Sequence, residues 1–281
     1  MKTYLDCYPC FLRQALEAAR VNGAREPEQR AVLVQVMRIL ETVDLAATPP
    51  EIAYRVHRIV RATLQVGDPY RTLKAESTRQ ALSLYEHLRS LVEAAADPLE
   101  VAVRLAIVGN LIDYGPPGAP ADISALRIAI DGALQRPPAI NHLEVFRNRL
   151  ADAEQVLYLA DNAGETVFDR VLIETLARPT TYVVKGAPVF NDAMLEDALA
   201  AGLDRVARII DNGSDAPGTI LDQCSAAVRE EFGAASLIVA KGQANYETLS
   251  DCDRDVFFLL QVKCPVIARY VGVPVGSMVI M

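Results

Sequence analysis

The feature that most constrains the fold of this chain is one strand–loop–helix unit, residues 155–177. QVLYLA is a short, continuously apolar run, which is typical of a buried strand. It leads directly into DNAGE and then into the amphipathic segment TVFDRVLIETLA. Asp161 and Asn162 therefore stand at the carboxyl end of a predicted strand, where open α/β sheets bind ligands.

Two later segments have the same arrangement. YVVKGAPVFNDAMLEDAL (182–199) places Lys185 at a strand end and Asn191–Asp192 at a helix start. LIVAKGQANYETL (237–249) places Lys241 at a strand end and Asn245 shortly after it. We expect the three strand ends to meet, and the rest of the chain to hold them together.

Alternation of apolar runs with amphipathic helices continues to the end of the chain. Runs that are apolar on both faces predict a mostly parallel sheet covered by helices on both sides, an α/β fold. The runs are VLYLA, TTYVVK, RVARIID, SLIVAK, DVFFLLQ, PVIARYVG and SMVIM.

The first half differs, because residues 11–109 show helical spacing of apolar residues and no β-branched alternation. PPGAPADIS (116–124) is the clearest break in the chain. The pattern predicts an all-helical N-terminal subdomain over 1–115, a connector with helices over 116–154, and an α/β core over 155–281.

Composition excludes several classes of protein. The net charge of −8 argues against a nucleic-acid partner held by electrostatics. No apolar run has the roughly 20 residues needed to cross a membrane, so we expect no membrane partner. The N-terminus lacks the apolar core of a signal peptide, so we expect a cytoplasmic protein with five reduced cysteines.

Asp161, Asn162 and Asp192 supply two carboxylates and an amide oxygen, which suit a hard divalent cation. Each of them alone is equally explained as a turn or helix-cap residue. Lys185 and Lys241 each precede a glycine, an arrangement that lets a lysine neutralise a phosphate while the backbone approaches it. Alternatively, these are lysines that extend to solvent at a sheet edge.

Several other polar residues permit two interpretations. Asn110 and Asp113 end an apolar helix, where they either reach into the cleft or cap the helix. Asp215 lies in a polar loop that either binds an anion or caps the next helix. Cys7 and Cys10 form a CxxC at a probable helix start, where a low thiol pKa is expected. They suit redox activity, or a metal site completed by Cys252, Cys264 or a histidine, or two half-buried thiols.

Four motifs, in order, closely resemble the DUF89 family, also called the damage-control phosphatase ARMT1-like family. They are GNLIDYG (109–115), DNAGE (161–165), KGAPVFNDA (185–193) and KGQANYE (241–247). The N-terminal CYPC is similar to the branch of that family with a CxxC near its start. The resemblance implies a helical N-terminal part against a Rossmann-like α/β/α core. It also implies a metal-dependent phosphatase acting on small phosphorylated metabolites, sugar phosphates among them.

The resemblance further implies a metal held by Asp161, Asn162 and Asp192, and a phosphate contact from Lys241. It implies that Asn110 and Asp113 line the same cleft. With Mg²⁺, Mn²⁺, Co²⁺ or Ni²⁺ bound there, a water would attack a phosphate whose charge Lys241 neutralises.

Other residues of the motifs receive supporting roles in this hypothesis. Backbone amides around Gly164, at a helix N-terminus, would add hydrogen-bond donors to the phosphate. Lys185 and Asn245 would help to bind the substrate. Glu165 or Asp113 would serve as general acid or base.

Three alternatives remain open. A carboxyl methyltransferase using S-adenosylmethionine would suit the fold, although a glycine-rich loop is missing after the first strand of the core. A non-catalytic protein that binds a phosphorylated metabolite would use the same site. A CxxC redox protein is the third.

Overall fold

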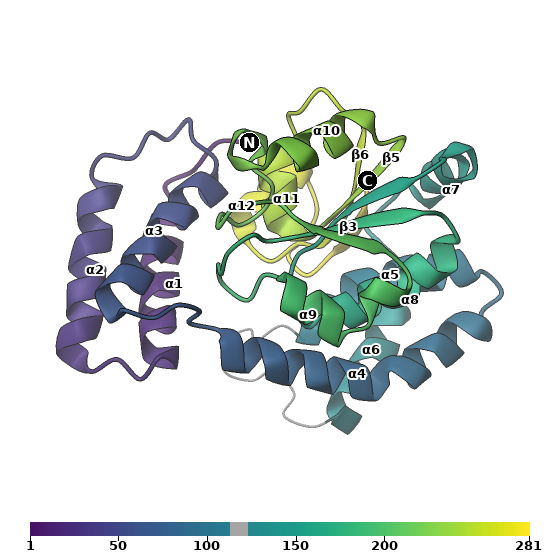
Figure 1. Ribbon diagram of the computed structural model, residues 1–281, viewed down its shortest axis with the longest axis horizontal. Coiled ribbons are helices and arrows are strands. Elements are labelled where there is room, and N and C mark those ends of the chain that lie inside the picture. Colours follow the sequence, from purple (N-terminus) through teal and green to yellow (C-terminus); the bar gives the residue numbers. More distant parts are fainter. Residues whose placement is uncertain (113–122) are drawn as a thin grey trace.

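The computed structural model describes residues 1–112 and 123–281 (Figure 1). Within these ranges seven strands form one sheet in the order β1-β7-β6-β5-β2-β3-β4. Every neighbouring pair is parallel except β6 and β7, which are antiparallel. The strands are β1 (Ile140–Asn141), β2 (Val156–Leu159), β3 (Thr180–Val184), β4 (Arg208–Asp211), β5 (Leu237–Lys241), β6 (Val256–Gln261) and β7 (Met278–Ile280).

Helices cover both faces of this sheet. They are α1 (Cys7–Val21), α2 (Glu26–Leu40), α3 (Pro49–Leu64), α4 (Arg71–Glu93), α5 (Pro98–Val108), α6 (Ile123–Leu134), α7 (Leu143–Asp152), α8 (Thr166–Leu176), α9 (Leu195–Ala200), α10 (Ala226–Ala234), α11 (Gly242–Leu249) and α12 (Pro265–Val271). The predicted α/β/α sandwich with a mostly parallel sheet is therefore confirmed.

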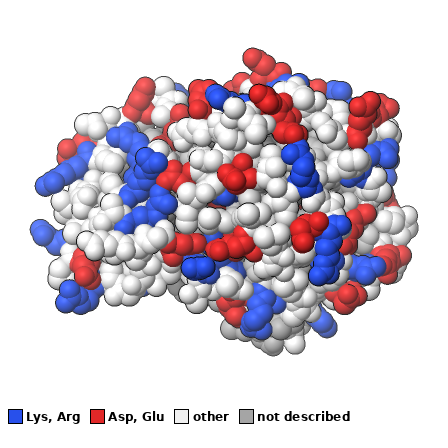
Figure 2. Space-filling view, in the orientation of Figure 1, with Lys and Arg blue, Asp and Glu red and all other residues white. Residues whose placement is uncertain are grey.

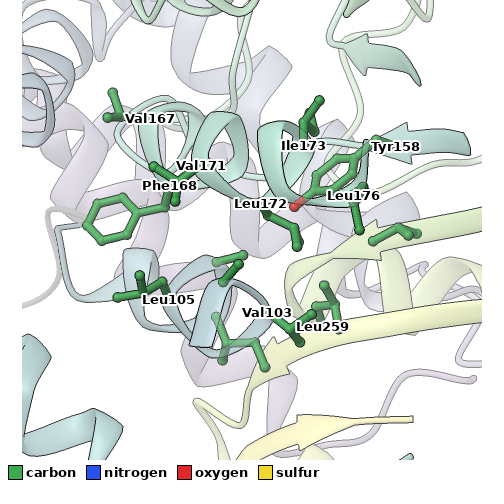
Figure 3. Close-up of a cluster of buried hydrophobic side chains, with 14 of the residues drawn as sticks. Val103, Leu105, Tyr158, Val167, Phe168, Val171, Leu172, Ile173, Leu176 and Leu259 are labelled. Atoms are coloured by element: carbon green, nitrogen blue, oxygen red, sulfur yellow. The ribbon is translucent and has the colours of Figure 1, made fainter. Parts of the chain in front are cut away.

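The two faces have separate hydrophobic cores because side chains alternate along each strand. Tyr158 points into the core formed with α4, α5 and α8, part of which Figure 3 shows around Phe168 and Leu105. Leu157 and Leu159 point into the opposite core, with α1–α3 and α10–α12. Burial on both sides explains why β2 is apolar at every position.

Local sequence sets the helix starts. Thr48 caps α3: its hydroxyl accepts from the Glu51 backbone N–H at 3.4 Å, and the Glu51 carboxylate accepts from the Thr48 backbone N–H at 2.6 Å. Pro49 and Pro50 fill the first turn, where no backbone donor is needed. α3 therefore begins close to the residue that the sequence indicates.

The helices of residues 1–112 lie in two places. α1–α3 form a group beside the end of the sheet, whereas α4 and α5 run along the face that α8 also covers (Figure 1). The boundaries at 115 and 154 stay a prediction. Among the described helices, none is both long and apolar enough to cross a membrane. On the face shown in Figure 2, acidic and basic side chains are interspersed.

Two local predictions are wrong. PVIARYVG, grouped with the strand-like runs, forms α12, because Pro265 starts a helix that buries Val266 and Ile267 and exposes Arg269 and Tyr270. In the connector, Ile140–Asn141 forms β1, which pairs with β7. So short a strand depends on its distant partner and has no local pattern of its own.

Candidate functional site

The ends of β5, β2 and β3 meet because these strands are neighbours in the sheet. The chain runs outward from β2 through β3 to β4, and then returns to the other side of β2 with β5. The order of strands therefore reverses between β2 and β5. Such a reversal point is the usual ligand site of an open α/β sheet.

Asp161, Asn162 and Asp192 are brought together by backbone pairing beyond the ends of β2 and β3. Asn162 and Asp192 form an isolated antiparallel bridge. The Ala193 N–H donates to the Asp161 carbonyl at 2.8 Å, and the Ala163 N–H donates to the Asn191 carbonyl at 2.9 Å. All three side chains are buried at the floor of a cleft.

The amide of Asn162 is held by carboxylates. Its nitrogen donates to Asp161 Oδ2 at 3.2 Å and to Glu165 Oε1 at 2.7 Å. The Asn110 amide nitrogen donates to the same Glu165 oxygen. Both of these hydrogen bonds use the side-chain nitrogen of Asn162, so the side-chain oxygen Oδ1 is the atom that Asn162 can offer to a cation.

Lys241 is fully buried beneath these residues. Its ammonium donates to Glu165 Oε2 and to Asp169 Oδ1, each at 2.8 Å. Burial alone would lower the pKa of Lys241, but Asp169 and Glu165 outweigh it and the pKa is raised. Lys241 is therefore charged and bound to protein carboxylates, and its contact with a phosphate stays a prediction.

Asp169 extends this buried network. It accepts the hydroxyls of Tyr158 and Tyr182, each at 2.7 Å. Burial raises the pKa of Asp169, an effect that the neighbouring Lys241 opposes. Asp169 cannot be identified as a site residue from the sequence, because a carboxylate inside an amphipathic helix resembles a surface residue until its partners are known.

The remaining predicted residues are distributed around the floor. The Lys185 ammonium lies 3.4 Å from Asp192 Oδ2 and donates to the Gly218 carbonyl. Gly164 is buried in the loop that leads into α8. Asp113 lies outside the described residues.

The Asn245 side chain forms hydrogen bonds at the ends of both β2 and β5. Its amide nitrogen donates to the carbonyls of Ala160 at 3.0 Å and Lys241 at 2.8 Å, and its oxygen accepts the Thr219 hydroxyl at 2.7 Å. The side chain is fully buried, and these contacts are all with the protein itself. Its proposed role in substrate binding stays a prediction.

Gly242 is required at the floor of the cleft. Its φ of +78° is in the left-handed region, and a Cβ there would lie 1.8 Å from Asp161 Oδ2. Only glycine lets α11 begin against the Asp161 carboxylate.

α3 contacts the two loops beside this floor. Arg58 and Arg61 form ion pairs with Asp215, and Arg61 also donates to the Pro188 carbonyl at 2.8 Å. The imidazole of His57 packs on Phe190, with ring centroids 3.4 Å apart. Asp215, considered above as a helix cap, instead joins α3 to the core.

The cleft has a volume of about 550 Å³ and two different walls. We call Asp161, Asn162 and Asp192 the oxygen wall. The thiol wall comes from the starts of α1, α11 and α12 and from Glu247 further along α11. It consists of Cys7, Cys10, Gln243, Glu247 and Cys264.

Low thiol pKa values, expected for Cys7 and Cys10, are not found. Burial raises the pKa of both thiols, and the acidic neighbours Glu247 and Cys264 add to the increase. All five cysteines are free thiols. Within residues 1–112 and 123–281, no group of three or more His, Cys, Asp or Glu side chains is arranged to hold a metal.

Comparison with known proteins gives the family. The model of the damage-control phosphatase ARMT1-like domain matches residues 3–279. The chain belongs to this family. A damage-control phosphatase of Archaeoglobus fulgidus is 36% identical over 285 residues, which cover 99% of this chain and 98% of that protein.

Two further comparisons agree with membership of the ARMT1-like family. The damage-control phosphatase PH1575 of Pyrococcus horikoshii is 30% identical, with 100% of this chain and 98% of that protein covered. The crystal structure of a DUF89 family protein from Pyrococcus horikoshii has a TM-score of 0.92 at 29% identity, covering 100% of this chain and 99% of that one. The resemblance seen in the four motifs is confirmed, and membership of this family supports a phosphatase.

Proposed function

We propose that this protein is a metal-dependent phosphatase that hydrolyses small phosphorylated metabolites such as sugar phosphates. One observation carries the proposal: in a chain of the ARMT1-like family, backbone pairing brings two carboxylates and an amide oxygen together at the reversal point of the sheet. This is the edge at which the fold binds ligands.

The residues of the oxygen wall fit a hard divalent cation. Two carboxylates and one amide oxygen are its preferred donors, and the contacts of Asn162 direct its nitrogen to neighbouring carboxylates. Gly242 keeps the space beside Asp161 free of a side chain. When bound, Mg²⁺, Mn²⁺, Co²⁺ or Ni²⁺ would supply Lewis-acid chemistry for attack of water on a phosphate.

The chain's own groups then have distinct tasks. Lys185, beside Asp192, adds positive charge for the phosphate oxygens. The backbone N–H of Gly164, in the buried loop before α8, would donate to the same oxygens. Lys241 holds Glu165, which in turn fixes the Asn162 amide. Glu165 and Asp113 are the candidates to transfer a proton.

The test is phosphate release from a panel of small phosphate esters. The protein is stripped of metal and then supplied with each of the four cations, beside Asp161→Ala and the exposed control Asp204→Ala. We expect metal to restore release in wild type and in Asp204→Ala, and not in Asp161→Ala.

A different result would assign another function. Cation binding that needs Asp161, with no phosphate release from any ester, would favour the non-catalytic phosphometabolite-binding protein. S-adenosylmethionine retained on purification would favour the methyltransferase. Equal release from Asp161→Ala and wild type would disprove the oxygen wall as the site.

A further inference from the structure

Glu247 is an acidic side chain of the cleft that the proposed phosphatase chemistry does not use. It stands on α11, five residues after Gly242, and the oxygen wall begins at the contact of Gly242 with Asp161. At about 1.5 Å per residue, Glu247 is on the order of 7 Å further along the helix. Asp161, which lies against Gly242, and Glu247 line the same cleft.

The carboxylate of Glu247 is held in place on one side. Its Oε1 accepts from the Gln243 amide nitrogen at 2.8 Å. Gln243 is itself fixed, because its oxygen accepts from the Lys263 backbone N–H at 3.2 Å and its nitrogen lies 3.6 Å from Cys264 Sγ. The i, i+4 spacing of Gln243 and Glu247 points both side chains to one face of α11.

The cations near Glu247 have other contacts. The Met1 ammonium donates to the Glu247 backbone carbonyl at 3.0 Å and lies 3.1 Å from the carboxylate of Asp251. Arg13 is largely exposed and donates to Cys10 Sγ, and Lys263 is exposed at the rim. In the part of the chain that the structure describes, no lysine, arginine or histidine forms an ion pair with Glu247.

The other titratable neighbours are acids. The thiols of Cys7 and Cys10 on α1, and of Cys264 before α12, line the same cleft as Glu247, which raises the pKa of Cys7 and Cys10. Burial raises the pKa of Glu247 to about 7, and the hydrogen bond from Gln243 and the charge of the N-terminal ammonium only partly offset this increase. A buried carboxylate without a cation is costly, so a positive ligand group there would be stabilised.

The neighbours indicate what kind of cation fits. Among the described residues, the thiols and Glu247 do not form a metal-binding group. An ammonium group needs hydrogen-bond acceptors, ideally with a negative charge among them. The Glu247 carboxylate is such an acceptor, and it lies beside neutral thiols. An organic amine therefore suits this wall better than a metal ion.

We propose that the thiol wall binds the far end of the substrate, and that Glu247 there accepts an ammonium group. The substrate class is a small phosphate ester with a primary amine at the end remote from the phosphate, as in an amino sugar phosphate. This inference rests on the proposed phosphatase function, with the phosphate bound at the oxygen wall.

The experiment compares glucosamine 6-phosphate with glucose 6-phosphate, which differ by one amine in place of one hydroxyl. We measure kcat/KM for both, with metal, for wild type, Glu247→Gln and the exposed control Glu230→Gln. We expect about a tenfold preference for the amine in wild type and in Glu230→Gln, and less than twofold in Glu247→Gln. Glu247→Asp, which keeps the charge, should retain part of the preference.

Any of three results would overturn the inference. One is a kcat/KM of the wild type for glucosamine 6-phosphate that is equal to or lower than that for glucose 6-phosphate. This result does not depend on whether any variant folds. Another is a preference that Glu247→Gln leaves unchanged. Stoichiometric Zn²⁺ binding that Cys7→Ser and Cys10→Ser abolish would also overturn it, since a metal would then be the occupant.

A second assay tests the phosphatase proposal independently of the amine. Hydrolysis of p-nitrophenyl phosphate by wild type and not by Asp161→Ala tests that function without any amine. If no ester is hydrolysed, calorimetric binding of the same two sugar phosphates tests the thiol wall alone. Tighter binding of the amine that depends on Glu247 would support the inference, and equal binding would overturn it.

Discussion

The two walls of the cleft are built in different ways. The oxygen wall comes from the ends of neighbouring strands, where backbone hydrogen bonds join Asp161 to Ala193 and Ala163 to Asn191. The thiol wall comes mainly from the starts of three helices, where Cys7 and Cys264 are far apart in the chain. Its members are joined by side-chain contacts, chiefly those of Gln243.

The two walls also differ in how their buried charges are paired. Beneath the oxygen wall, the buried cation Lys241 is matched by Glu165 and Asp169. At the thiol wall, the described contacts give Glu247 no ion pair, and the nearby Arg13 is exposed. Substitutions at the oxygen wall should therefore affect stability and chemistry together, whereas substitutions at the thiol wall should change specificity and pH dependence.

The largest effect is expected for Lys241→Met. It leaves the buried carboxylates of Glu165 and Asp169 without a cation, which should lower the free energy of unfolding by about 3–5 kcal/mol. Urea denaturation at pH 7 measures the loss. Arg13→Met, at an exposed cation beside the thiol wall, is the control and should change stability by less than about 0.5 kcal/mol.

Adding Asp169→Asn to Lys241→Met should recover part of this loss, since one unpaired charge is removed. If Lys241→Met loses no more stability than Arg13→Met, then ion pairing beneath the oxygen wall does not stabilise the fold.

Gly242→Ala should remove most of the activity. Its Cβ would lie 1.8 Å from Asp161 Oδ2, so the carboxylate or the start of α11 must move. We expect metal-dependent phosphate release to fall about a hundredfold, or about 2.7 kcal/mol in the barrier. Gly272→Ala is the matched control, because its φ is also positive, +81°, and no heavy atom lies within 4 Å of its Cβ. Similar activities of the two variants would contradict the prediction.

Glu247 should make stability depend on pH. Its pKa is raised from 4.5 to about 7, so between these values the folded protein holds the proton more tightly than the unfolded chain does. The free energy of unfolding should therefore fall as the pH rises through this window, by about 2 kcal/mol. Denaturation at pH 5 and pH 8 measures this, and Glu247→Gln should lack this fall. An identical pH dependence in both proteins would exclude Glu247 as its source.

The smallest effect is expected for Arg61→Ala, which loosens the attachment of α3 to the loops beside the oxygen wall. Loss of the contacts with Asp215 and Pro188 should lower stability by about 1 kcal/mol and raise KM for phosphate esters several-fold. Arg55→Ala, exposed on the same helix, should change neither quantity. If both variants behave alike, α3 does not contribute to the shape of the cleft.

Much of the fold and the candidate oxygen wall is predictable from sequence. Apolar runs that end in Asp161, Lys185 and Lys241 identify parallel strands, and parallel strands place their carboxyl ends at one edge. The strand β1 and the helix α12 are not predictable in this way. Ile140–Asn141 pairs with β7, which is remote in sequence. PVIARYVG is too short and too apolar for its period to distinguish helix from strand.

The sequence by itself determined the α/β architecture, the family and the set of residues that the oxygen wall brings together, because all three depend on local patterns and on motifs. Only the tertiary structure decided that Lys241 is buried between two carboxylates, that Asp215 joins α3 to the core, and that Glu247 faces thiols from both ends of the chain. These features arise from contacts between residues remote in sequence. No local periodicity specifies such contacts, because they form only when separate elements pack together.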